Sequence, residues 1–237
     1  MTQSIIKVCG LTHPDDVRCA VEAGATHVGF VFAPDRRRTV AASLWLELMD
    51  ASGAASRVGV FQGNKLSDVL LLADLWGLSA IQLHGGYSAE DVLHCTQRSE
   101  VPVWWAQKPE PYGERWRVVA PPAGVGCVVL DSAHAGDFGG TGQALPWSGI
   151  DRPEWPFLVA GGLNAHNVAE AVQLLKPSGV DVSSGVEDST QAPRKSHDAI
   201  RAFVCAARNA LVSRETIQNI AASPDDTRLG QPGEKSW

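Results

Sequence analysis

The sequence lacks most features that mark specialised classes of protein. Its 237 residues include five cysteines, an odd number with no Cys-x-x-Cys pair, so neither a disulfide framework nor a zinc site is indicated. No stretch approaches the roughly 18 apolar residues of a membrane span. The first residues also lack the charged and then long apolar segments of a secretory signal. We therefore expect a cytoplasmic protein with no membrane partner.

Charge is scarce as well. Charged residues make up 19% of the chain, below the usual ~25%, which argues against a disordered or coiled-coil protein. The formal net charge is −6, and the one basic cluster is the run of three residues from Arg36 to Arg38. Because proteins that bind nucleic acid show clustered basic surface, we expect no nucleic-acid partner.

Short apolar runs, by contrast, recur along the chain, separated by longer amphipathic segments. Each run has four to six residues and is rich in β-branched or aromatic side chains. Strands that are buried on both faces of a parallel sheet have this pattern. The eight predicted strands are Ile5–Cys9, His27–Phe32, Ser56–Phe61, Ala80–Leu83, Val101–Ala106, Val125–Leu130, Phe157–Ala160 and Gly179–Val182.

Most intervals between these strands carry helix signals. Thr12 as an N-cap and Pro14 in the first turn predict a helix that ends near Ala23. Gln107–Gly124 predicts a short or irregular helix, and Asp131–Arg152 predicts mostly loop. The other predicted helices are Lys65–Trp76, Ser88–Ser99, Asn164–Leu175 and His197–Ala210.

Strands and helices that alternate in this way predict a closed (β/α)₈ TIM barrel, an α/β fold, as a single domain over residues 1–210. The polar residues 211–237 are expected to form a disordered or loosely attached extension. The alternative is an open, doubly wound sheet. It is disfavoured because no Gly-x-Gly-x-x-Gly motif follows the first strand.

In a barrel, the residues at the C-terminal ends of the strands line the active site. The seventh predicted strand ends at Gly161-Gly162 and runs into a helix near Asn164, and the eighth ends at Ser183-Ser184-Gly185. These glycines either form tight turns only or let backbone N–H groups approach an anion. Barrels often bind phosphate after strands seven and eight, so the two sites together favour phosphate.

Polar residues at other strand ends are candidates for chemistry. Cys9 shares a strand face with Lys7, although a lone cysteine is more often a core residue. Asp131 follows the sixth strand, where it either caps a turn or acts as an acid in a partly dry barrel mouth. Gln82 and His84 alternate onto one strand face and either contact substrate or hydrogen-bond within the barrel.

With these residues in place, the chain resembles the phosphoribosylanthranilate isomerases over about residues 5–203. Seven segments at strand ends carry the resemblance, and they occur in the expected order. They are Lys7–Thr12, Gly29–Phe32 with Arg38 and Val40, Val58–Phe61, Ile81–Gly85, Leu130–Ser132 with Gly139–Gly142, Ala160–Asn164 and Asp181–Glu187.

The resemblance implies an Amadori rearrangement of N-(5-phosphoribosyl)anthranilate, without cofactor or metal, in tryptophan biosynthesis. By similarity, Asp131 is the general acid at the furanose ring oxygen, and Cys9, as a thiolate, is the base at the sugar C2. Arg38 is expected to bind the anthranilate carboxylate, as its planar fork suits. The phosphate is expected to contact Gly161, Gly162, Ser184 and Gly185. The expected partner is thus a phosphorylated small molecule, bound by a monomer or homodimer.

Two expectations concern details of this site. A useful base is poised near pH 7, so Cys9 is expected to titrate below the ~8.5 of a free thiol. The family usually continues after the eighth strand with Pro-Gly-x-Lys-Asp. This chain has Ala192-Pro193-Arg194-Lys195-Ser196 there, without the glycine and the aspartate.

Two other functions remain as alternatives at this point. A metal-dependent sugar-phosphate epimerase on the same barrel would need His and Asp ligands at several strand ends. The second strand ends in Phe30-Val31-Phe32 and offers none, so no metal site is expected. A non-catalytic barrel that binds sugar phosphate as a regulator would need neither Cys9 nor Asp131.

Overall fold

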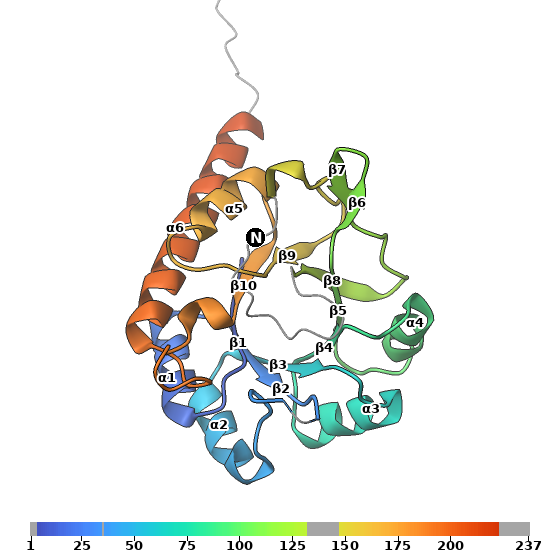
Figure 1. Ribbon diagram of the computed structural model, residues 1–237, viewed down its shortest axis with the longest axis vertical. Helices are drawn as coiled ribbons and strands as arrows, with labels where there is room; N and C mark the ends of the chain where they lie inside the picture. Colours follow the sequence, from blue (N-terminus) through green and yellow to red (C-terminus); the bar gives the residue numbers. More distant parts are fainter. Residues whose placement is uncertain (1–3, 35, 132–146, 223–237) are drawn as a thin grey trace, which may run out of the picture.

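Eight parallel strands form a closed barrel in the computed structural model of the protein, which describes residues 4–34, 36–131 and 147–222 (Figure 1). The strand order around the barrel is β1-β10-β9-β8-β5-β4-β3-β2. The strands are β1 (Ile5–Cys9), β2 (His27–Val31), β3 (Ser56–Phe61), β4 (Ala80–His84), β5 (Val103–Gln107), β8 (Val125–Leu130), β9 (Phe157–Val159) and β10 (Gly179–Val182). Closure confirms the predicted fold class, so the open doubly wound alternative is wrong.

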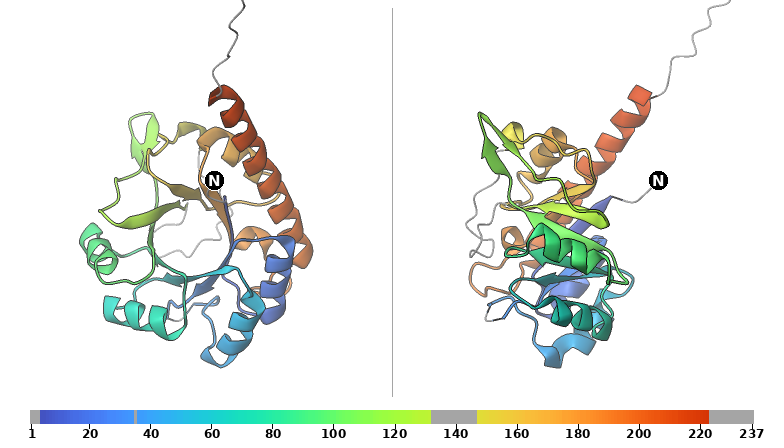
Figure 2. Two further views of the ribbon diagram at one scale, coloured as in Figure 1. Left: turned by 180° about the vertical axis from the view of Figure 1, so that it is seen from behind. Right: turned by 90° about the vertical axis from the view of Figure 1, so that its right-hand side faces the viewer.

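Helices surround the barrel and cover the outer faces of its strands (Figures 1 and 2). In the last helix but one, Val168, Ala171, Val172 and Leu175 repeat at helical spacing and are all buried. The helices are α1 (Pro14–Ala23), α2 (Trp45–Ser52), α3 (Leu66–Leu75), α4 (Ala89–Thr96), α5 (Val168–Leu175) and α6 (His197–Ala222). Of these, α2 carried no helix signal that we read from the sequence.

Two predicted helix starts are wrong. Helix α1 is capped by His13, because its side chain accepts a hydrogen bond from the backbone N–H of Asp15, and Thr12 is not the cap. Helix α5 begins four residues after Asn164. The Asn164 side chain accepts a bond from the N–H of His166, and the Asn167 side chain binds the backbone on either side of Leu163, so a turn precedes the helix.

The connections after the fifth and eighth strands also differ from the prediction. The fifth contains an antiparallel hairpin of β6 (Glu110–Tyr112) and β7 (Arg115–Arg117) in place of a short helix. Helix α6 continues to Ala222, past the predicted end at Ala210, and Leu211 belongs to the core. Most of the predicted loop at 131–152 lies outside the described residues, as does the polar segment 223–237.

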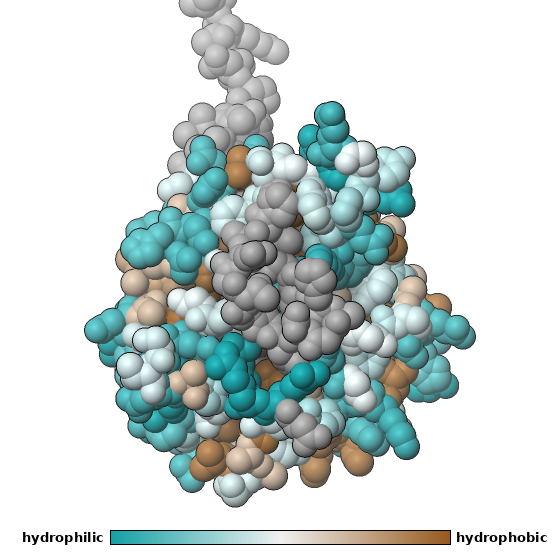
Figure 3. Space-filling view, in the orientation of Figure 1, coloured by the Kyte–Doolittle hydropathy of each residue, from teal (hydrophilic) through white to brown (hydrophobic). Residues whose placement is uncertain are grey.

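The surface is mixed in character. Hydrophilic side chains cover much of the face in Figure 3, and small apolar areas appear along the lower edge, where α2 and α3 lie. Leu46, Leu71 and Leu75 are exposed on these helices. Within the described ranges, no helix has the length and apolar character needed to span a membrane.

Candidate active site

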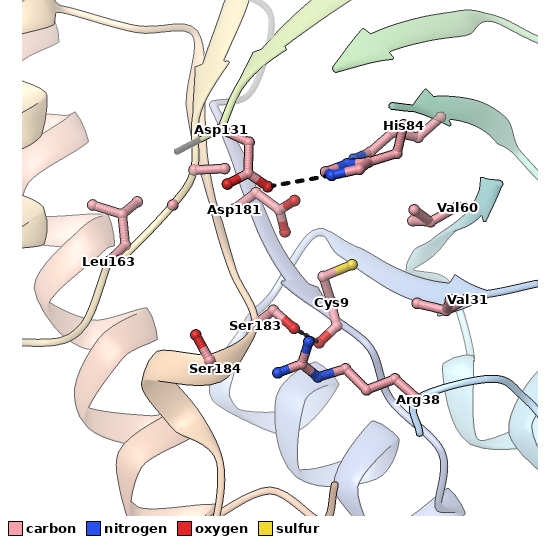
Figure 4. Close-up of a pocket in the computed structure, with 14 residues that line it drawn as sticks. Cys9, Val31, Arg38, Val60, His84, Asp131, Leu163, Asp181, Ser183 and Ser184 are labelled. Carbon is pink, nitrogen blue, oxygen red and sulfur yellow. Dashed lines mark hydrogen bonds and ion pairs between the residues drawn. The ribbon is translucent and has the colours of Figure 1, made fainter. Parts of the chain in front are cut away.

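A pocket lies at the C-terminal ends of the barrel strands and takes its walls from β1, β2, β3, β4, β8, β9 and β10 (Figure 4). All the predicted site residues except Gly185 line it. The lining residues are Cys9, Val31, Arg38, Val60, Gln82, His84, Asp131, Ala160, Gly161, Gly162, Leu163, Asp181, Ser183 and Ser184. The barrel topology therefore brings together residues from both ends of the chain.

Cys9 ends β1 with its sulfur directed into the pocket, toward the space that His84 and Asp181 also face (Figure 4). A Cβ at Gly29 on the neighbouring β2 would lie 2.8 Å from this sulfur, so the glycine makes room for the thiol. Burial raises the pKa of the Cys9 thiol, and the nearby Lys7 ammonium only partly opposes this. The pKa of Cys9 is therefore raised, and the expected lowering is wrong.

Asp131 follows β8 and faces His84 of β4 across the pocket. Its Oδ2 lies 3.8 Å from His84 Nε2, and the Asp131 side chain is 18% exposed. Gln82 is buried two residues before His84, with its Nε2 3.4 Å from His84 Nδ1. Asp131 is thus a pocket carboxyl with limited access to water, in contact distance of an imidazole.

Arg38 enters the pocket from the loop after β2. It is 4% exposed, and its side chain crosses Gly10, where a Cβ would lie 2.7 Å from the Arg38 Cδ. The φ of Gly10 is +70°, a conformation that favours glycine. Arg38 Nε donates to Glu187 Oε1 at 2.6 Å, and the half-exposed Arg37 binds the other Glu187 oxygen at 2.8 Å. Of the three consecutive arginines, Arg38 is the one that lines the pocket.

The ends of β9 and β10 form another part of the pocket wall. Gly161 and Gly162 both have positive φ, at 72° and 69°, and Ser184 begins a short 3₁₀ segment. Behind them, the buried Lys195 donates from Nζ to the Ser183 carbonyl at 2.9 Å. Burial lowers the pKa of Lys195 to about 8, although Glu187 at 3.6 Å opposes this. This part of the pocket therefore combines glycine-rich backbone with a nearby ammonium group.

Gly185 lies behind this wall. A Cβ at Gly185 would lie 1.8 Å from the carbonyl oxygen of Leu163, which itself lines the pocket. No side chain fits between these two segments without moving one of them. Gly185 therefore brings the loops after β9 and β10 into direct contact.

The segment with the unusual sequence after β10 is held by Asp16 of α1. The Asp16 carboxylate is fully buried and accepts hydrogen bonds from both Arg194 Nε and NH2, from the Lys195 N–H and from His197. Ser196 stands where the family has aspartate, and its Oγ accepts from the Ala199 N–H at the start of α6. Arg194 thus holds the segment through its ion pair with Asp16, and Ser196 caps the start of α6 at the position of the missing aspartate.

Sequence reasoning assigned no site role to Lys7, Asp181, Glu187 or Lys195. Lys7 and Asp181 form a buried ion pair at 2.7 Å beneath Cys9, and the register of β1 and β10 places them directly opposite each other. Opposite charges in the middle of two otherwise apolar strands were a signal that could have revealed this pair.

Fold and pocket together define a class, the (β/α)₈ barrels with a small-molecule pocket at the C-terminal ends of the strands. A family model described as N-(5'phosphoribosyl)anthranilate (PRA) isomerase matches residues 6–206. The chain belongs to this family. Among the described residues, no three His, Cys, Asp or Glu side chains are grouped as metal ligands.

Relatives of known function match most of the chain. An N-(5'-phosphoribosyl)anthranilate isomerase from Desulforudis audaxviator is 37% identical over 229 residues, which cover 88% of this chain and 100% of that protein. An N-(5'-phosphoribosyl)anthranilate isomerase from a Roseiflexus species is 35% identical, and the match covers 86% of this chain and 98% of that protein.

Solved structures agree with the sequence comparison. The crystal structure of TrpF from Jonesia denitrificans has a TM-score of 0.73 at 34% identity and covers 88% of this chain and 98% of that one. The crystal structure of phosphoribosyl anthranilate isomerase from Thermotoga maritima has a TM-score of 0.69 at 27% identity. The match covers 87% of this chain and 100% of that one.

Proposed function

We propose that the protein converts N-(5'-phosphoribosyl)anthranilate to 1-(2-carboxyphenylamino)-1-deoxyribulose 5-phosphate in tryptophan biosynthesis. One observation carries this proposal: a buried thiol and a carboxyl, Cys9 and Asp131, line one pocket from strands that are separated by β10 and β9. An aldose–ketose rearrangement needs an acid and a base at different atoms of one sugar. A regulator that only binds sugar phosphate needs neither.

Asp131 is the proposed general acid. Its proton goes to the furanose ring oxygen, the bond from that oxygen to C1 breaks, and the nitrogen lone pair forms an iminium with C1. The position of Asp131 at the pocket wall supports this role, because its carboxyl lines the same pocket as Cys9 and is only 18% exposed. His84 is proposed to contact the substrate beside it, and Gln82 orients His84.

Cys9 is the proposed base. Its thiolate takes the proton from C2, and the electron pair of the broken C–H bond forms a C1–C2 double bond while the iminium becomes an amine. The resulting enolamine then tautomerises to the ketone. Because burial raises the pKa of Cys9, the thiolate is a minor species at pH 7 and a strong base once formed.

The two ends of the substrate carry negative charge, and the pocket has a suitable group for each. Arg38 is proposed to bind the anthranilate carboxylate through its planar fork. Gly161, Gly162 and Ser184 are proposed to contact the phosphate, and Gly185 holds their loops together.

Two broader properties follow from this proposal. A doubly charged phosphate ester does not cross a bilayer unaided, so we propose a cytoplasmic enzyme that shares a compartment with the source of its substrate. We also propose a monomer or a homodimer. Both forms are named for the Thermotoga maritima relative, whose structures include monomers generated from a dimeric isomerase.

The proposal is tested by turnover of the purified full chain with phosphoribosylanthranilate generated in situ. We expect conversion to the ketose phosphate at the same rate with and without a metal chelator. A folded protein that leaves the substrate unchanged would contradict the proposed function. Activity that disappears with chelator and returns with metal would favour the epimerase alternative.

A further inference from the structure

The floor of the pocket contains a buried ion pair that the proposed acid–base chemistry does not use. Lys7 of β1 is fully buried and its Nζ lies 2.7 Å from Oδ2 of Asp181 on β10. Both side chains point to the barrel interior below the substrate pocket, and Asp181 also lines the pocket. Burying two charges in a barrel core costs stability that an apolar pair would not cost. The pair therefore calls for an explanation beyond folding.

Cys9 lies directly beside this ion pair. Lys7 and Cys9 are alternate residues of one strand, so their side chains share a face. A Cβ at Gly29 would lie 2.8 Å from Cys9 Sγ and 3.1 Å from Lys7 Cε, so both side chains pack over the same glycine. The ammonium interacts with the Asp181 carboxylate and with the Cys9 thiol, and it has three N–H donors for this purpose.

We propose that Lys7 is a positioning residue that stabilises the thiolate of Cys9, and that Asp181 holds the Lys7 ammonium in place for this task. The inference rests on the proposed role of Cys9 as the base. When the thiolate forms, the S–H bond breaks, its electron pair stays on sulfur and the proton leaves to water. The negative charge then lies next to a cation in a site of low dielectric, where such a contact is strong.

Asp181 has a second part in this arrangement. Burial disfavours the charged form of a lysine, but the charges of Asp181 and Cys9 and their hydrogen bonds keep the pKa of Lys7 raised in spite of burial. Asp181 is the larger of these two influences, so its removal would lower the pKa of Lys7 and weaken the ammonium as a partner for an anion. Lys195, the next ammonium group, donates to the Ser183 carbonyl and contacts Glu187, and its charge has a smaller influence on Cys9 than that of Lys7.

The first experiment measures the thiolate directly and needs no substrate. Iodoacetamide reacts with the thiolate, so the alkylation rate of Cys9 at a fixed pH reports the thiolate fraction. We expect alkylation of Cys9 at pH 8 to be at least tenfold slower in Lys7→Met than in the wild type, with Lys7→Arg between the two. Alkylation of Cys127, which is buried among the strands, serves in the same digest as the control for unfolding.

The second experiment separates a structural role from a positioning role. Lys7→Met leaves the Asp181 carboxylate buried without its partner and is expected to lower the Tm. The double variant Lys7→Met/Asp181→Asn has neither charge and is expected to regain most of that loss. If the pair serves Cys9, the double variant still has a kcat at least tenfold below wild type, with KM changed less than threefold.

The outcomes divide clearly. Wild-type alkylation rates in Lys7→Met, or a double variant that regains kcat together with Tm, would overturn the proposal, since the pair would then serve folding alone. If Lys7→Met does not fold, the Cys9 alkylation rate and the kcat of the double variant decide between a structural and a positioning role. An inactive wild type would refute the proposed function, yet slower alkylation in Lys7→Met would still show that Lys7 stabilises the thiolate.

Discussion

Arg38 Nε donates a hydrogen bond to Oε1 of Glu187 at 2.6 Å, which joins the loop after β2 to the loop after β10. The two residues are 149 positions apart in the sequence. Burial raises the pKa of Glu187, but the bond from Arg38 and the charges of Lys195, Arg38 and Arg37 outweigh it, so this pKa is low and the carboxylate is ionised. The guanidinium plane is thereby fixed at the pocket wall, and a fixed fork loses less entropy when it binds a carboxylate.

Substitution of Arg38 is expected to affect binding more than turnover. Arg38→Lys keeps a positive charge but has neither the planar fork nor the Nε donor that Glu187 accepts. We expect KM for phosphoribosylanthranilate to rise at least tenfold, about 1.4 kcal/mol, with a smaller change in kcat. In Arg36→Ala and Arg37→Ala, KM should change less than threefold. Steady-state kinetics on the three variants provide the check, and greater sensitivity at Arg37 would identify the wrong arginine.

Gly185 is expected to tolerate no side chain. Alanine there would place its Cβ 1.8 Å from the Leu163 carbonyl oxygen, so the loops after β9 and β10 must separate. Gly185→Ala should therefore raise KM at least tenfold and weaken inhibition by inorganic phosphate. Gly126→Ala is the control. Gly126 lies on β8 far from the pocket. A Cβ at this position would have Pro102 Cβ as its nearest neighbour, at 3.3 Å. Equal effects in both variants would show a general loss of stability instead.

Inorganic phosphate alone is expected to stabilise the protein. At 100 times its dissociation constant, a ligand that binds only the folded state adds about 2.7 kcal/mol. In a domain of this size, that corresponds to a rise in Tm of roughly 5–10 °C. Thermal melts in phosphate and in chloride at matched ionic strength test this expectation. If the two melts coincide in the wild type, the ends of β9 and β10 do not form a phosphate site.

The barrel strands could be predicted because most of their side chains are buried, so each strand is a short and mainly apolar run. β1, β3, β8 and β10 match the predicted bounds without change. The helix starts were harder to predict, because α1 is capped by His13 and not by the neighbouring Thr12, and α5 begins after a turn between Asn164 and Asn167. Only the local geometry decides between such neighbouring positions. The hairpin of β6 and β7 is short and mostly exposed, so hydrophobic periodicity gives no signal for it.

Candidate residues of the site could be identified from the sequence only where a strand end marks them. Cys9, Asp131 and His84 follow apolar runs, and the topology brings them into one pocket. Side chains that contact a site residue from a distant part of the chain could not be identified from the sequence. Glu187 binds Arg38 across 149 positions, and nothing in either segment specifies the other. The raised pKa of Cys9 was also missed, because burial of the thiol is a property of the packed barrel.

Asp16 is expected to stabilise the loop after β10 in a pH-dependent way. Burial raises its pKa, but hydrogen bonds from Arg194, the Lys195 N–H and His197 outweigh this, so the folded-state pKa lies below the unfolded value. Its contribution to stability is thus complete above about pH 4 and is lost as the pH falls through the lower folded-state pKa. We expect Asp16→Asn to cost about 2 kcal/mol at pH 7, and much less near pH 2.

Thermal melts of the wild type and Asp16→Asn across this pH range provide the measurement. Asp15→Asn is the control, because Asp15 is exposed and its carboxylate pairs with the neighbouring Arg18 and His13. A difference between the wild type and Asp16→Asn that does not shrink at low pH would mean that the carboxylate charge is not what holds Arg194.

The proposed catalytic pair is the assignment most exposed to failure. General acid or base catalysis contributes about 10²–10⁴-fold, so Cys9→Ser and Asp131→Asn should each lower kcat at least ~10²-fold with the Tm within a few degrees of wild type. Serine matches the shape of cysteine but is too weak an acid to form an anion in this pocket. Asparagine still hydrogen-bonds but has no proton to give. Cys205→Ser, at the exposed cysteine of α6, should leave kcat unchanged. If Cys9→Ser retains near wild-type kcat, the thiol is a core residue, and His84, 3.8 Å from Asp131, becomes the first candidate for the base.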